Sequence, residues 1–153
     1  MWHRRKKSAL ISKPLLGYLS GSRVAILGTL NSDDTVHLVP IVFSNNSNYI
    51  YSAIDGKPKK TRFLKRLSNI RRDSIATLLV SDYKENWENL SFVMIYAKAE
   101  ILQTRVEERK VALKMLKRKY PQYKDSKLLP TSSTVIRFTP RKIVQWSAKT
   151  AQK

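Results

Sequence analysis

The 153-residue sequence lacks cysteine and has few glycines, histidines and acidic residues. Without cysteine the chain forms no disulfide, holds no thiolate nucleophile and builds no cysteine-based zinc site. Its two histidines, His3 and His37, lie far apart in the sequence, and no cluster of His, Asp and Glu has the spacing of metal ligands. The sequence therefore predicts no metal site, and if the protein is an enzyme we expect its reactivity to come from a cofactor.

The four glycines form neither a dinucleotide-binding fingerprint nor a P-loop. A Ser-His-Asp triad stays open, because its members need not be neighbours in the sequence, although no Gly-x-Ser-x-Gly elbow exists. Apolar runs such as Val39–Phe43 are far shorter than the ~20 residues that span a bilayer. The basic start is not followed by the apolar segment of a secretory signal. We therefore expect a cytoplasmic protein without a membrane span.

Acidic residues number 11 against 30 Lys+Arg, so the net charge is 30 − 11 = +19. This charge favours anionic partners such as nucleic acid or phosphorylated ligands. One basic cluster, between Lys57 and Arg72, begins in a loop and continues into a predicted helix. Basic residues and free N–H groups at a helix N-terminus make a phosphate site. A second cluster, between Arg105 and Lys119, lies on a predicted helix and is interpreted as a solvated face.

The length and the 42% of hydrophobic residues suit one packed domain over residues 1–153, with a core at about 8–148. Apolar periodicity predicts strands at 23–30, 35–43, 49–54, 74–81, 92–102, 134–139 and 142–146. The first three, joined by short polar turns, are predicted to form an antiparallel meander. Pro40 in the second strand indicates a sheet edge or a bulge.

Helical spacing predicts helices at 8–20, 61–71 and 105–119. The first would use Leu10, Leu15, Leu16 and Leu19 as its apolar side. Thr104 and Glu107 fit a capping box in which Thr104 is the N-cap of the third helix. Residues after Trp146 are expected to fray. Antiparallel strands with interspersed helices predict a mainly β protein, a small barrel decorated by helices.

Several segments, taken in their order along the chain, carry a resemblance to a known family. They are His37–Phe43, Tyr49–Ala53, Lys57–Thr61, Leu67–Asp73, Ile75–Val80, Trp87–Leu90, Val93–Leu102 and Ile143–Ser147. This ordered set resembles the flavin-binding split-barrel family related to pyridoxamine 5′-phosphate oxidase. The loop Lys57–Thr61, the Trp87 segment and the segment Lys119–Tyr123 are most similar to a small branch associated with the deazaflavin coenzyme F-420.

The resemblance implies a six-stranded antiparallel split β-barrel that forms a homodimer with two cofactors, F-420 or FMN, at the subunit interface. It implies an oxidoreductase that moves a hydride to or from an unidentified small molecule. The resemblance also assigns cofactor-binding residues and no catalytic side chain. The ring would lie along Val39, Pro40, Ile41 and Val42, next to Tyr51 and Ser52, with the phosphate on Lys57, Lys59, Lys60 and Thr61, and with Trp146 and the partner's Trp87 near the ring.

Each assignment has a purely structural alternative. The lysines would then form a solvated loop, Ser52 would be a small strand residue, and the tryptophans would supply buried area. The chain also departs from the family at three positions. Phe92 stands where pyridoxamine phosphate oxidases carry a glutamine that contacts the flavin, Ala97 replaces a usual glycine, and little sequence follows Trp146. Phe92 and the short segment after Trp146 argue against pyridoxamine phosphate as the substrate, whereas Ala97 is expected to alter only the local packing of its strand.

Two other functions stay open from the residues. A cofactor-binding protein without turnover, a carrier or a sensor, fits the lack of an evident substrate group. A nucleic-acid-binding barrel fits basic residues interleaved with aromatics, although no motif of a known RNA-binding module is present. We rank nucleic acid third, and expect His37 to be a strand-surface or core residue rather than a ligand.

Overall fold

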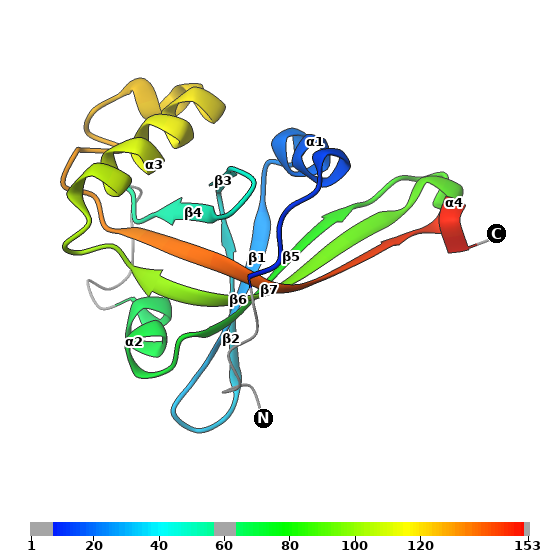
Figure 1. The fold of residues 1–153 in the computed structure, drawn as a ribbon, viewed down its shortest axis with the longest axis horizontal. Helices are drawn as coiled ribbons and strands as arrows, with labels where there is room; N and C mark the ends of the chain where they lie inside the picture. Colours follow the sequence, from blue (N-terminus) through cyan, green and yellow to red (C-terminus); the bar gives the residue numbers. More distant parts are fainter. Residues whose placement is uncertain (1–7, 57–63, 152–153) are drawn as a thin grey trace.

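The computed structural model describes residues 8–56 and 64–151. Within these residues, seven strands form a single sheet, and four α-helices pack around it (Figure 1). The strands are β1 (Ala25–Leu30), β2 (Val36–Ile41), β3 (Ser44–Asn45), β4 (Ile50–Ala53), β5 (Ile75–Asp82), β6 (Ser91–Ile101) and β7 (Val135–Ser147). The helices are α1 (Lys13–Gly21), α2 (Lys65–Arg72), α3 (Val106–Lys119) and α4 (Ala148–Ala151), with 3₁₀ turns η1 (Trp87–Asn89) and η2 (Pro121–Lys124).

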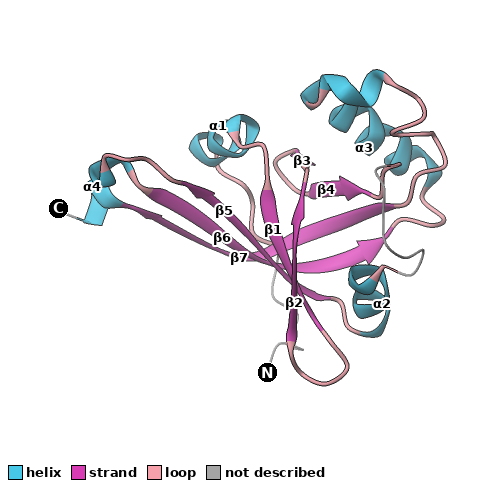
Figure 2. Cartoon of the chain, turned by 180° about the vertical axis from the view of Figure 1, so that it is seen from behind, coloured by secondary structure: helices cyan, strands magenta, loops and turns pink. Residues whose placement is uncertain are grey.

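All strands pair antiparallel, in the order β2-β1-β5-β6-β7-β4-β3. The sheet curls strongly, and in the view of Figure 1 α1 and α3 lie above it and α2 lies below (Figures 1 and 2). The two outermost strands in this order, β2 and β3, are consecutive in the chain and separated only by Val42 and Phe43. The curled sheet with its covering helices fits the split barrel expected from the sequence.

The strand count is seven rather than six, because the tyrosine after α3 interrupts one long strand. The Tyr120 hydroxyl accepts from the N–H of Phe43 (3.2 Å) and lies 3.1 Å from the carbonyl oxygen of the same residue. A side chain thus occupies the backbone groups with which Phe43 would otherwise bond a neighbouring strand. The expected strand 35–43 therefore ends at Ile41, and the short β3 resumes at Ser44.

The predicted three-strand meander is wrong. β1 and β2 do form a hairpin, and Pro40 lies in the edge strand β2 as predicted. β4, however, pairs with β3 and with the C-terminal strand β7, where Tyr51 lies opposite Arg137. The side chain of Asn46 accepts from the N–H groups of Asn48 and Tyr49, which closes a tight β3–β4 turn. β4 therefore lies between β7 and β3 and not next to β2.

The two predicted C-terminal strands are one continuous strand, β7. Sequence analysis places a break at Pro140 and Arg141, but Ala97 of β6 lies opposite Pro140 and Tyr96 lies opposite Lys142. Arg141 is the additional residue of a β-bulge. A bulge accommodates a proline, which has no N–H to give to the ladder, without ending the strand.

Two hydrophobic clusters lie on opposite sides of the sheet. The first fills the curl of the sheet and includes the fully buried side chains of Leu19, Leu27, Leu78 and Ile95. The second lies beneath α3, which buries Ala112, Leu113 and Leu116 against β4, β7 and the loop that contains Leu129. The second cluster fixes α3 to the sheet.

Two of the three predicted helix starts are displaced, and the third, at residue 61, lies outside the described residues. α1 begins at Lys13, with Pro14 in its first turn, where a missing N–H is harmless. Leu10 therefore lies before the helix and is 70% exposed, contrary to prediction. α3 begins at Val106 with Arg105 at the N-cap position and no side-chain cap, so the predicted Thr104 cap is wrong. Glu107 bonds Lys110 instead of reaching back to a cap.

The ends of β5, β6 and β7 extend as an arm that carries η1 and α4 (Figure 1). The N–H of Ala148 donates to the carbonyl of Leu90, so the segment predicted to fray forms the helical turn α4 at this end. Among the described residues no helix is long and apolar enough to cross a membrane.

Candidate functional site

The predicted ring-binding segment, Val39–Val42, alternates between the two faces of the sheet. Ile41 is buried in the first cluster and Val39 packs against it, whereas Pro40 is exposed. Val42 packs against the second cluster instead. Its carbonyl accepts from the Ser52 hydroxyl at 2.8 Å. The structure thus brings Ser52 to the end of the segment, and Ser52 itself is 4% exposed.

Tyr51 points to the opposite face of β4 from Ser52. Its ring belongs to the second cluster, and its hydroxyl donates to Glu108 Oε1 of α3 at 2.9 Å. Burial raises the pKa of the Tyr51 phenol, and the bond to the Glu108 carboxylate raises it further. The Tyr51 side chain therefore links β4 to α3, and a cofactor contact by this residue stays a prediction.

The predicted phosphate-binding residues Lys57, Lys59, Lys60 and Thr61 lie outside the described residues. The chain that leads to them is held firmly. The Tyr123 hydroxyl donates to the Asp55 carboxylate, and the N–H of Gly56 donates to the carbonyl of Leu128 at 2.8 Å. A Cβ added to Gly56 would lie 2.6 Å from the Lys127 carbonyl oxygen, so only glycine fits this approach. The connection between α3 and β7 thus fixes where the basic loop begins.

One row of apolar side chains crosses five strands on the outer face of the sheet. Residues directly opposite one another in antiparallel strands share a face. The register places five such residues in line, namely Pro40, Ile26, Leu79, Met94 and Val144. Beside this row on β2, Val36 and Leu38 are 59% and 65% exposed. The ring-binding segment therefore borders a broad apolar surface, which we call the outer face.

The arm carries the two predicted tryptophans. Trp146 lies opposite Phe92 in the β6–β7 ladder, and their rings stack with centroids 5.6 Å apart and planes 18° from parallel. Trp146 is 39% exposed, and Trp87 in η1 is 69% exposed. Neither tryptophan is a core residue. The Phe92–Trp146 pair offers a planar apolar surface, which suits contact with a flat ring system.

Within one chain these residues form two separate groups. The first group is the Val39–Val42 segment with Ser52 and the stem of the basic loop. The second is the aromatic arm, which points away from β3 and β4 (Figures 1 and 2). A site that uses both groups needs the arm of a second chain. The sequence assigned Trp87 to the partner's site and Trp146 to the cofactor, and both assignments stay predictions.

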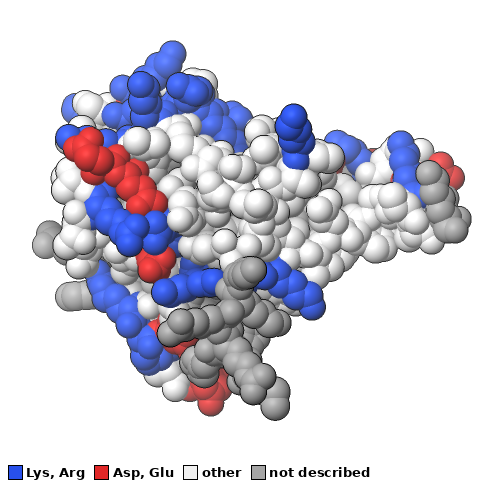
Figure 3. Space-filling model, in the orientation of Figure 1, with Lys and Arg blue, Asp and Glu red and all other residues white. Residues whose placement is uncertain are grey.

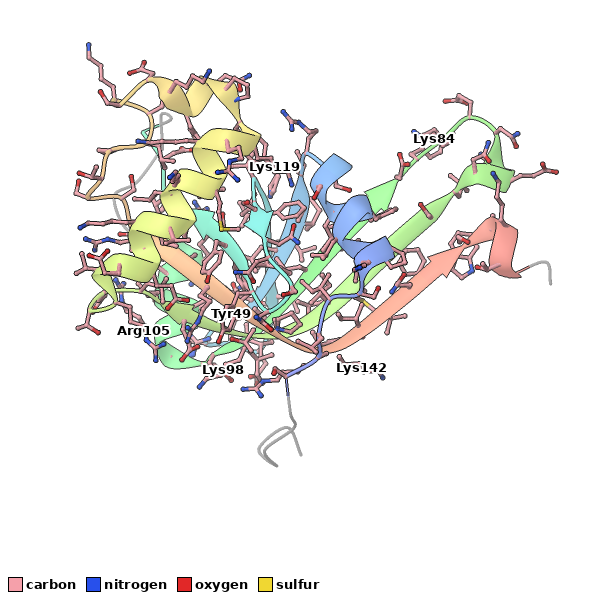
Figure 4. The ribbon with its side chains drawn as sticks, turned by 45° about the horizontal axis from the view of Figure 1, so that its top comes forward. Tyr49, Lys84, Lys98, Arg105, Lys119 and Lys142 are labelled. Carbon is pink, nitrogen blue, oxygen red and sulfur yellow. The ribbon has the colours of Figure 1, made fainter. Side chains whose placement is uncertain are left out.

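A buried ion network, for which the sequence gives no local signal, lies beneath α3. Arg137 of β7 is 6% exposed and bonds Glu108 (3.0 and 3.1 Å) and Glu100 (2.8 Å). Its guanidinium lies 4.7 Å from the centre of the Tyr49 ring, and Tyr49, Lys98 and Arg105 surround the network (Figure 4). Burial alone would raise the pKa of Glu100, but the bond and charge of Arg137 lower it below its ordinary value.

Lys119 forms a second unexpected cluster at the end of α3 (Figure 4). Its ammonium donates to the carbonyl of Leu19 at 2.9 Å and lies 3.8 Å from the centre of the Phe43 ring. Both contacts favour the charged amine. Burial and the nearby Arg23 disfavour it and prevail, so the pKa of Lys119 is lowered to about 8. The residue ties α3 to α1 and β2–β3.

His37 lies in β2, in a predicted strand, on the same side as Val39, and is partly buried. Its Nδ1 is buried without a hydrogen-bond partner in the described structure. Burial, followed by the charges of Arg66 and Lys65, lowers the pKa of His37, so the imidazole is neutral at pH 7. Among residues 8–56 and 64–151 no group of three His, Asp or Glu side chains could hold a metal ion.

Residues 12–147 match the family described as pyridoxamine 5′-phosphate oxidase. No curated protein matches the chain. Among solved structures, a conserved hypothetical protein of Mycobacterium tuberculosis aligns with a TM-score of 0.73 and 17% identity, over 97% of this chain and 92% of that chain. A FAD-binding protein of Mesorhizobium loti aligns with a TM-score of 0.64 and 14% identity, over 90% and 95%. The heme storage protein HutZ of Vibrio cholerae aligns with a TM-score of 0.68 and 9% identity, over 88% and 93%.

Proposed function

The chain belongs to the pyridoxamine 5′-phosphate oxidase family, and from this premise we propose that it is an oxidoreductase whose homodimer binds F-420 or FMN between its subunits. The observation that carries the proposal is the outer face, which borders the ring-binding segment Val39–Val42. Its five-residue apolar row crosses the sheet from β2 to β7. A second copy covers such a row best when it presents the same face.

The residues present fit a planar cofactor that carries a phosphate. The stacked pair of Phe92 and Trp146 gives an apolar plane for the ring system. Lysines 57, 59 and 60 lie between the fixed stem at Gly56 and the start of α2 at Lys65. Phosphate contacts from such side chains are charge-assisted and stronger than neutral hydrogen bonds. One end of the proposed site is thus apolar and the other strongly basic.

The cofactor, when bound, supplies hydride transfer, and the chain's own residues bind, orient and shield it. Pro40 and Val42 provide a rigid backbone edge for the ring, since the proline has no N–H and Val42 is held by Ser52. The Phe92–Trp146 pair of the second subunit excludes water from the other side. The neutral His37 brings no further positive charge close to this segment.

F-420 is the preferred cofactor, and FMN is the alternative. Both carry a phosphate and a planar tricycle, so the basic loop and the aromatic pair suit either of them. F-420 also carries a polyanionic glutamate tail, which the net charge of +19 favours. The proposed substrate is a small molecule, as the family resemblance implies.

A second candidate function is cofactor binding without turnover. One structural neighbour is a heme storage protein, so the fold is compatible with binding alone. The side chains of Val39–Val42 include no acid or base, which suits cofactor binding without turnover.

Absorption and fluorescence titration of the purified protein with FMN and with F-420 tests the proposal. We expect saturable binding of one of them with one site per chain, and reduction of the bound cofactor in the presence of a reductant. Saturable binding without turnover on any donor or acceptor would favour the carrier. A protein that binds neither molecule would refute both functions.

A further inference from the structure

The second basic cluster of the sequence forms a continuous stripe on α3. Exposed cations recur at Lys110, Lys114 and Arg118, each four residues after the last. Four residues advance a helix by about 6 Å and bring the chain back to nearly the same face. The stripe is therefore about 12 Å long, and Lys117 and Lys124 flank its end.

Within the described residues, only the first cation of the stripe has an acidic partner. From Lys110 to Lys124 the chain has six Lys+Arg and no Asp or Glu. Within the part of the chain that the structure describes, Lys114, Lys117 and Arg118 form no ion pair, and only Lys110 has an acidic partner, Glu107. Lys and Arg atoms gather over this end of the molecule in Figure 3. The C-terminal dipole of α3 stabilises the last-turn cations but not Lys110 or Lys114.

We propose that this α3 stripe is a docking surface for the phosphate backbone of double-stranded nucleic acid. Duplex DNA carries one negative charge per ≈ 1.7 Å of axis, so a stripe of about 12 Å meets several phosphates at once. In this proposal the cations of the stripe contact phosphates, which supply affinity but carry no sequence information, and binding is driven by release of counterions.

The packing of α3 argues against a membrane as the partner. A basic amphipathic helix binds a lipid surface by burying its apolar face among the acyl chains. The apolar face of α3, with Ala112, Leu113 and Leu116, is already buried against the sheet. The exposed apolar side chains of α3 are only Val106 and Val111. A phosphate polymer needs no apolar anchor, so it fits this surface better.

The surface is separate from the aromatic arm and from the apolar row of the proposed cofactor site. α3 lies at the opposite end of the molecule from the arm (Figures 1 and 2), and its stripe is separate from the apolar row of the outer face. A dimer formed through the outer face would leave both stripes accessible. The inference therefore holds or fails regardless of whether FMN or F-420 binds.

The test compares two triple variants with equal charge loss. Lys114→Ala, Lys117→Ala and Arg118→Ala remove the stripe. Lys13→Ala, Arg71→Ala and Lys149→Ala remove three exposed cations from α1, α2 and α4. Both variants keep a formal charge of 19 − 3 = +16. Fluorescence anisotropy with a 20-base-pair duplex of arbitrary sequence, over a series of salt concentrations, measures the affinity and its salt dependence.

We expect the wild type to bind the duplex at low salt and the stripe variant to bind at least about tenfold more weakly. The slope of log K against log salt should fall by about 2.7 in magnitude, about 0.9 for each lost phosphate contact. The control variant should keep most of the wild-type affinity. Equal losses in both variants would show only the general field of the charged protein and overturn the proposal. Absence of wild-type binding at 50 mM salt, or stripe-dependent binding to anionic vesicles but not to the duplex, would also overturn it.

Discussion

Arg137 shows what single residues contribute beneath α3. One buried guanidinium bonds carboxylates of β6 and α3, and Tyr51 completes the link through Glu108. The sequence places Glu108 in a helix start and assigns it no partner, because Arg137 lies 29 residues away. No local pattern predicts such a pair. Removing one member of a buried pair leaves the other charge without compensation, so the network holds α3 in one position.

Lys119 supplies a residue-scale prediction about pH. Its pKa is about 8 in the folded protein and 10.5 in its ordinary state, so the unfolded chain binds more protons between these values. The contribution of Lys119 to the free energy of unfolding therefore rises as pH increases from about 8 to 10.5. Lys119→Met removes this dependence. Between pH 8 and 10.5 the free energy of unfolding of Lys119→Met, relative to that of the wild type, should fall by about 1 kcal/mol. This figure is smaller than the full pKa difference implies, because the amine is partly exposed to solvent.

Chemical denaturation of wild type and variant at pH 7.5 and 10.5 measures this change. Lys114→Met, an equal charge change on the exposed side of the same helix, is the control. Identical pH dependence of the two variants would contradict the assignment of the lowered pKa to Lys119.

At the scale of elements, local periodicity predicts most strands and helices within a few residues of their observed bounds. Short apolar runs mark β1, β5 and β6, although each strand buries only about every second side chain. Pairing between distant elements escapes such reasoning. β4 pairs with β7, more than 80 residues later in the chain, and no local sequence signal indicates that pairing. The split of one strand into β2 and β3 depends on Tyr120, which lies 77 residues away.

Gly56 carries the element-scale prediction, because it fixes where the basic loop leaves β4. A methyl group there would lie 2.6 Å from the Lys127 carbonyl oxygen, so backbone must move. We expect Gly56→Ala to lower the free energy of unfolding by about 1–3 kcal/mol, as overpacking does. Gly17→Ala in α1 is the control, since nothing lies within 4 Å of its added Cβ. A helical Gly→Ala change there should stabilise by roughly 0.5–1 kcal/mol. Urea denaturation showing no loss for Gly56→Ala would disprove the close approach.

At the scale of the whole molecule, the outer face is an apolar surface that the described part of one chain does not cover. The sequence predicts that each of these residues is an apolar residue of a strand. That the five residues line up in one row follows only from the pairing register of the five strands, which the sequence does not reveal. The residues predicted to bind the cofactor also fall into two separate groups, because the arrangement of the strands keeps them apart. The sequence groups them by resemblance, whereas one folded chain holds Val39–Val42 and the tryptophans of the arm apart.

The proposed dimer gives a prediction at this scale. We expect a homodimer that buries well over ~1,200 Å², the size of a stable specific interface. Leu79→Glu places a charge in the middle of the apolar row and should give a folded monomer. Val111→Glu, the same kind of change on an exposed side chain of α3, should leave the dimer intact. Light scattering distinguishes these outcomes, and a monomeric wild type at micromolar concentration would rule out the shared site.

The phosphate end of the proposed site provides the most direct test of the central claim. We expect Lys60→Ala to weaken FMN or F-420 binding about ten- to a hundredfold, because it removes a charge-assisted contact worth roughly 1.5–3 kcal/mol. Lys117→Ala makes the same charge change on α3 and should leave the affinity unchanged.

The measurement is the dissociation constant of the cofactor for wild type and both variants, at low salt and at 0.1 M salt, where surface charges are screened beyond ~10 Å. The account predicts a loss specific to Lys60→Ala that persists at 0.1 M. Equal losses in the two variants that salt abolishes would contradict it, and would leave only a diffuse basic surface in place of a phosphate site.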